Sequence, residues 1–141
     1  MTKTTPGFTW LRVPIFQFWY VGVCKTKTQF SRELKRLKLN DVNVEKIWRA
    51  DADAATYFFE KERKQLAIVV MNAEKVPHDA DVASVVGLVA HEIIHVWQSI
   101  KEDVGENNPG HEMEAYYLQA LIQEALYGLY WKWATRLVRK L

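Results

Sequence analysis

The stretch from residue 82 to residue 100, VASVVGLVAHEIIHVWQSI, most constrains the fold of this 141-residue chain. Its length and apolar content are those of a helix that could cross a membrane. It nevertheless contains His91, Glu92 and His95, and ionisable groups carry a high energetic cost inside a bilayer. The stretch therefore predicts a largely buried helix of a soluble domain, on which the two histidines need a partner.

The composition is that of one globular domain, with 49% hydrophobic and 26% charged residues and a net charge of +2. A lone cysteine, Cys24, excludes an internal disulfide framework. The near-neutral net charge gives no general case for nucleic acid as a partner. Basic residues concentrate between Lys25 and Lys38, where a solvated helix face is the simplest interpretation.

The pattern of apolar residues predicts an α+β fold, in which helices pack on a small antiparallel sheet that includes a hairpin. Aromatic and β-branched residues predict strand over 8–24, interrupted at Pro14. Two strand-like runs around a charged turn predict the hairpin. The other expected elements are a helix over 28–39, hairpin strands over 55–60 and 66–72, a helix over 80–103 that starts at Asp79 or Asp81, a loop over 105–110 and a helix from 111.

The two ends of the chain carry separate expectations, within a single domain over 1–141. Residues 1–7 read as a loose tail, and the N-terminus lacks the apolar run of a secretory signal, so a cytoplasmic location is expected. A continuous helix to the C-terminus would be about 45 Å long, against a radius of gyration of about 14 Å. The helix is therefore expected to break near Gly128 or to project over 129–141. The residues of 129–141 could pack in the core, contact a second copy (a homo-oligomer) or another partner, or lie at a membrane interface.

Residues 91–95 read His-Glu-Ile-Ile-His, the motif that carries chemistry. Positions four apart share one helix face, so both imidazoles can bind one Zn²⁺ ion. Glu92 is rotated by about 100° from His91 and can stand beside the metal as a general base. Gly87, one turn before His91, leaves room for something to approach.

A third metal ligand is expected downstream of the pair. Glu102, Asp103 and Glu106 lie on the same helix or in the loop, and cannot easily fold back onto the ion. The start of the next helix can do so. The candidates there are His111, Glu112 and Glu114.

HEIIH followed by Glu112 and a small residue, Ala115, resembles the gluzincin class of zinc metallopeptidases. The texts HEIIHVWQ (91–98) and EMEAYYLQ (112–119) also resemble small phage and prophage proteins of mostly unknown substrate. The resemblance implies a minimal zincin-like domain with His91, His95 and Glu112 as zinc ligands. It favours Glu112 over Glu114, whose following residues are bulky. The chain departs from the gluzincin pattern at Tyr116, where an aspartate commonly orients a ligand histidine.

The function expected from this resemblance is hydrolysis of a peptide or protein substrate by a zinc-activated water, with Glu92 as base and then acid. Donors to the oxyanion could be His111, Tyr116 or Tyr57, and the substrate could add to a strand edge in ATYFFE or LAIVVM. The alternatives are a zinc-binding structural or interaction protein on the same fold, with little or no catalysis, and a metal-free helical adaptor.

Overall fold

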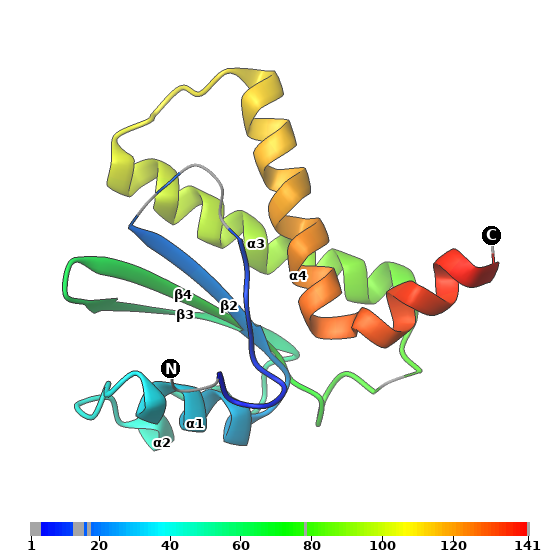
Figure 1. The fold of residues 1–141 in the computed structure, drawn as a ribbon, viewed down its shortest axis with the longest axis horizontal. Coiled ribbons are helices and arrows are strands. Elements are labelled where there is room, and N and C mark those ends of the chain that lie inside the picture. Colours follow the sequence, from blue (N-terminus) through cyan, green and yellow to red (C-terminus); the bar gives the residue numbers. More distant parts are fainter. Residues whose placement is uncertain (1–3, 13–15, 17, 78, 141) are drawn as a thin grey trace.

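The computed structural model describes residues 4–12, 16, 18–77 and 79–140, with side chains up to Tyr130 (Figure 1). The elements in chain order are β1 (Thr9–Trp10), β2 (Trp19–Cys24), α1 (Lys27–Arg36), α2 (Val44–Ile47), β3 (Ala54–Lys61), β4 (Lys64–Met71), α3 (Val82–Val104) and α4 (His111–Lys140). The expected α+β class and the expected order of helices and hairpin are confirmed.

The described strands form one sheet in the order β1-β2-β4-β3. β1 pairs antiparallel with β2, and β3 pairs antiparallel with β4, but β2 and β4 run parallel. The expectation of an antiparallel sheet is therefore wrong for its central pair. The segment from β2 to β4 contains two helices and a strand, which is long enough to return the chain in the same direction.

Helices cover both faces of the sheet, as Figure 1 shows, with α1 and α2 on one side and α3 and α4 on the other. Alternate residues of a strand point to opposite faces, so β4 contributes to two cores. Val69 and Met71 pack in the core with α3 and α4, whereas Ile68 and Val70 pack in the core with α1. This burial on both faces explains why β4 reads as an unbroken apolar run.

The turn between β3 and β4 has a backbone conformation that its residues, Glu62 and Arg63, do not favour. Lys61 pairs with Lys64, so Glu62 and Arg63 form a two-residue loop, with φ angles of 50° and 67°. Positive φ at both central positions is the requirement of a type I′ turn, which asparagine and glycine adopt at the lowest cost. The pairing of β3 with β4, which is buried from Leu66 to Met71, holds these two residues in that conformation.

The N-terminal end of the chain differs from expectation, whereas the last helix breaks close to the expected position. Thr5 is buried and its carbonyl accepts the amide of Phe8, so residues 4–7 pack on the fold rather than forming a loose tail, and residues 1–3 lie outside the description. α4 has its non-helical residue at Tyr130, two positions beyond Gly128, and Figure 1 shows the helix changing direction there. Leu129 is buried, in agreement with the core-packing alternative at that position, and the side chains of residues 131–141 lie outside the described part of the chain.

Within the described residues, no helix combines the length and apolar content needed to cross a membrane.

Candidate metal site on helix α3

α3 begins and ends on residues suited to those positions. The Asp81 side chain accepts the amide of Ser84 at the N-terminus, so Asp81 is the cap among the two expected aspartates. Gly105 ends the helix with a φ of 73°, a left-handed conformation that glycine adopts without steric cost. The motif residues therefore lie in the middle of a regular helix, where their relative directions follow the helical repeat.

The two histidine rings converge. Nε2 of His91 and Nε2 of His95 lie 3.1 Å apart, with the ring planes at 81°. Two imidazole nitrogens bound to one tetrahedral zinc, each about 2.0–2.1 Å from it, would lie about 3.3 Å apart. The pair therefore fits two positions of a zinc coordination sphere. Without a metal, the same distance is that of a hydrogen bond between a neutral ring's N–H and the other ring's free nitrogen.

Both histidines are exposed, which corrects the expectation that they lie on a buried surface of the helix. α3 buries the stripe that contacts the sheet, and the apolar neighbours Ile93 and Val96 belong to that stripe. Residues two apart on a helix differ in direction by about 200°, so His95 points away from the side occupied by buried Trp97. Gly87 has open space around it, as expected for a residue near an accessible site.

Glu92 points inward, unlike its neighbours. Only 8% of its surface is exposed, and one carboxylate oxygen accepts the hydroxyl of Thr56 at 2.5 Å. A short hydrogen bond to a charged acceptor is among the stronger contacts in a protein. It holds the carboxylate against strand β3, on the face of the sheet that α3 covers.

β3 is the last strand of the described sheet, so one of its edges has no strand beside it. The amide of Asn72 donates to the carbonyl of Asp53, and hydrogen-bonded pairs in an antiparallel ladder alternate from there. By this alternation, the backbone groups of Thr56 and Phe58 face the free edge. The segment ATYFFE thus offers an edge. LAIVVM does not, because β4 is paired on both sides.

The first turn of α4 contacts α3 through Glu114. Its carboxylate accepts Trp97 Nε1 at 2.7 Å and Lys101 Nζ at 3.1 Å. These two contacts, the tryptophan hydrogen bond first, lower the pKa of Glu114 below its ordinary value. Glu114 is therefore already bound on the flank of α3 that is opposite His95.

Glu112 is not brought to the histidines in this structure. It lies two residues before Glu114, which on a helix is a rotation of about 200°, and its side chain is exposed. Among the described residues, no group of three His, Cys, Asp or Glu side chains lies close enough to hold a metal ion. The structure thus brings the two histidines together, holds the Glu92 carboxylate against Thr56 on the inward side of α3, and leaves the third ligand as a prediction.

The oxyanion candidates lie in different places. Tyr57 is wrong for this role, because its side chain belongs to the α1 core and its hydroxyl accepts the amide of Arg49 at 3.0 Å. That core is on the other face of the sheet from Glu92. His111 and Tyr116 are exposed on the first turns of α4.

Thr56 is a site residue that the sequence reasoning missed. The signal available was weak: alternation along the hairpin places Thr56 and Tyr57 on opposite faces, but does not say which face meets the motif helix. Only the packing of α3 over β3 and β4 decides it.

No match was found when the chain was compared with models of known protein families, with curated proteins and with solved structures.

Proposed function

We propose that the chain is a zinc-dependent peptidase whose site is built on α3. The observation that carries the proposal is the convergence of the His91 and His95 Nε2 atoms at 3.1 Å. Glu92 is the next residue after His91 in the sequence, and its carboxylate is held by Thr56. In this proposal His91 and His95 hold the metal, and Glu112 supplies the third ligand. When bound, zinc lowers the pKa of a coordinated water toward neutral and polarises a peptide carbonyl.

Glu92 acts as the general base in the proposed reaction and returns the proton to the leaving amine. Its contact with Thr56 supports this role, because the hydroxyl orients the carboxylate and donates to its ionised form. The carboxylate is largely shielded from water, which strengthens its interaction with a nearby proton donor.

The free edge of β3 is the proposed substrate platform. An extended peptide can add to such an edge through main-chain hydrogen bonds, with little demand on its side chains. Thr56 connects this edge with Glu92, so a peptide carbonyl paired beside Thr56 would lie near the general base. Phe58 is 45% exposed on the same face of the strand and offers apolar contact to a substrate side chain.

A metal-binding protein without peptidase activity is the second candidate. It is favoured by the position of α4, whose Glu114 is engaged by Trp97 and Lys101 while Glu112 points elsewhere. Two histidines alone make a weaker site than three ligands, and a site of this kind could support a contact or a fold without hydrolysis.

The decisive experiment compares the metal content and peptidase activity of the native chain with those of Glu92→Gln. Metal content is measured after dialysis, and activity is measured on a labelled unfolded casein and on a mixed peptide library. The amide is nearly isosteric and can still pair with Thr56. We expect about one zinc per chain in both proteins, and activity lower by 100-fold or more in the variant, the order of effect of a general base.

His91→Ala and Glu112→Ala test the ligands, and Glu106→Ala, an exposed glutamate in the loop before α4, is the matched control. The two ligand variants are expected to lose zinc, while the control keeps it. Zinc retained by Glu92→Gln, together with no cleavage by the native chain, would favour the second candidate. Absence of zinc from the native chain would refute both.

A further inference from the structure

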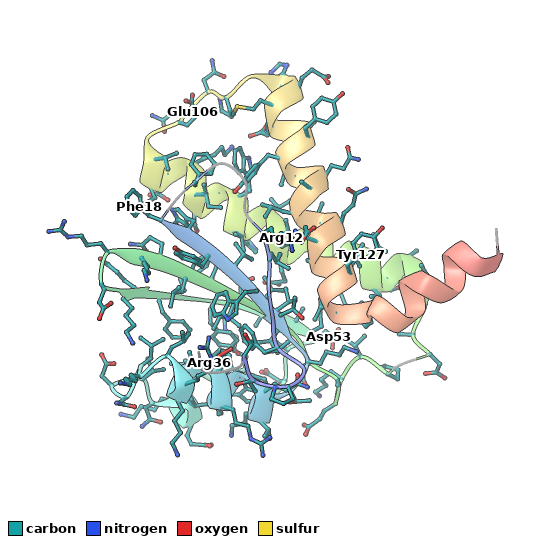
Figure 2. The ribbon with its side chains drawn as sticks, viewed as in Figure 1. Arg12, Phe18, Arg36, Asp53, Glu106 and Tyr127 are labelled. Carbon is teal, nitrogen blue, oxygen red and sulfur yellow. The ribbon has the colours of Figure 1, made fainter. Side chains whose placement is uncertain are left out.

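A cavity of about 230 Å³ opens on the α1 face of the sheet, on the opposite face from the histidine pair. It lies where the C-terminal end of α1 leaves strands β1, β2 and β4 uncovered. Figure 2 shows one of its residues, Arg36, beside α1 on the far side of the sheet from α3. The lining residues are Trp10, Tyr20, Arg36, Leu37, Lys64 and Leu66. Two are cations, two are aromatic and none is acidic.

One wall of the cavity is held from behind by a buried carboxylate. Glu33 is fully buried, and its carboxylate accepts both Arg36 Nε and Trp10 Nε1, the latter at 3.3 Å. Desolvating a carboxylate this completely is costly unless it is paired, and here both partners line the cavity. Because the contact uses the Nε atom of Arg36, the two terminal nitrogens of the guanidinium still carry donors for an anion.

The other wall repeats the combination of a cation with a ring. Lys64 Nζ lies 5.9 Å from the centre of the Tyr20 ring, within range of a cation–π contact. Lys64 is exposed and Tyr20 is 40% exposed, so both side chains are accessible. Leu37 and the buried Leu66 complete the lining with apolar surface.

We propose that this cavity binds a small ligand made of one planar ring that carries an anionic group. The ring would pack against Trp10 and Tyr20, and the anion would bind Arg36 and Lys64. The volume is below the range of about 300–1,000 Å³ that holds drug-sized ligands, so the ligand has the size of a single ring system. Carboxylate and phosphate share the geometry that a guanidinium recognises, and they define the two sources to distinguish.

The test is calorimetric titration of the full chain with indole-3-acetate, for a ring with a carboxylate, and with phenyl phosphate, for a ring with a phosphate. Phenol and inorganic phosphate supply the ring and the anion separately. At least one ring anion is expected to bind with a Kd of about 1 mM or tighter, from the usual affinity per atom of small ligands. The separate parts are expected to bind at least tenfold more weakly.

Lys64→Gln and Lys35→Gln form a matched pair, since each removes one exposed lysine charge but only Lys64 lines the cavity. Lys64→Gln is expected to weaken binding about tenfold, the value of a charged hydrogen bond, while Lys35→Gln leaves it unchanged. Lys64→Arg should retain binding. Equal losses in the two glutamine variants would show a general charge effect, and either that result or no binding of any ring anion would overturn the proposal.

Discussion

Two helical glycines in different surroundings allow the same substitution to test the packing of α4. A Cβ atom added at Gly128 would lie 2.9 Å from Cγ2 of Val23 and 3.1 Å from Cγ2 of Thr9. Val23 is fully buried and β-branched, so its side chain has little freedom to move. A Cβ atom added at Gly87 of α3 would meet nothing within 4 Å.

The magnitudes follow from two competing effects. Alanine in a helix interior is more favourable than glycine by up to about 1 kcal/mol. Overpacking a rigid contact costs about 1–3 kcal/mol. Gly87→Ala gains only the first term and is expected to stabilise the fold by about 0.5–1 kcal/mol. Gly128→Ala has the same helical gain but also the larger overpacking cost. It is therefore expected to destabilise the fold by about 1–2 kcal/mol.

Thermal unfolding followed by circular dichroism at 222 nm measures both variants against the native chain. For a chain of this length, 1 kcal/mol corresponds to a shift of about 3 °C in Tm. The expected result is therefore a rise of about 2–3 °C for Gly87→Ala and a fall of about 3–6 °C for Gly128→Ala. Equal stabilisation by both substitutions would refute the close approach of α4 to β1 and β2.

Two further predictions concern single contacts. Replacing Glu62 and Arg63 together by Asn and Gly should raise the free energy of unfolding by about 1 kcal/mol or more, because both residues have positive φ. Urea unfolding measures this change, and an unchanged or lower free energy of unfolding would contradict the assigned turn. The pKa of Glu114 is lowered in the folded chain, so its stabilising contribution is present above the ordinary value of 4.5 and is lost as the pH falls through the lowered pKa. Glu114→Gln should therefore flatten the acid side of a Tm-against-pH curve, whereas Glu106→Gln should not; parallel curves would refute the contact with Trp97 and Lys101.

Most of the elements could be predicted from local sequence. The helix over 82–104 and the hairpin have strong periodic patterns, and Asp81 provides a recognisable cap. The direction of β2 relative to β4 was not predicted, because β4 is antiparallel to β3 and parallel to β2, and its apolar run does not say which neighbour runs in which direction. The conformation of Glu62 and Arg63 could not be predicted either, since the pairing of β3 with β4 imposes it against the local preference of those residues.

The candidate site also has features that the sequence predicted and features that it did not. The i, i+4 spacing of His91 and His95 was enough to predict that their rings meet, because helical geometry alone produces that contact. Their exposure was not predictable, since the apolar neighbours that suggested burial face the sheet on another side of the helix. The partner of Glu92 on β3 depends on which face of the hairpin α3 covers.

Sequence by itself determined the HEIIH helix, the histidine pair and the α+β class, because each depends on residues close together in the chain. Tertiary structure alone decided that Thr56 binds Glu92, that Glu114 is engaged by Trp97 and Lys101, and that Glu33 lies behind Trp10 and Arg36. The residues in each of these contacts, apart from the pair Glu33 and Arg36, come from separate elements. Their meeting depends on strand order and helix packing, which are set by the burial of both faces of one sheet and not by any local pattern.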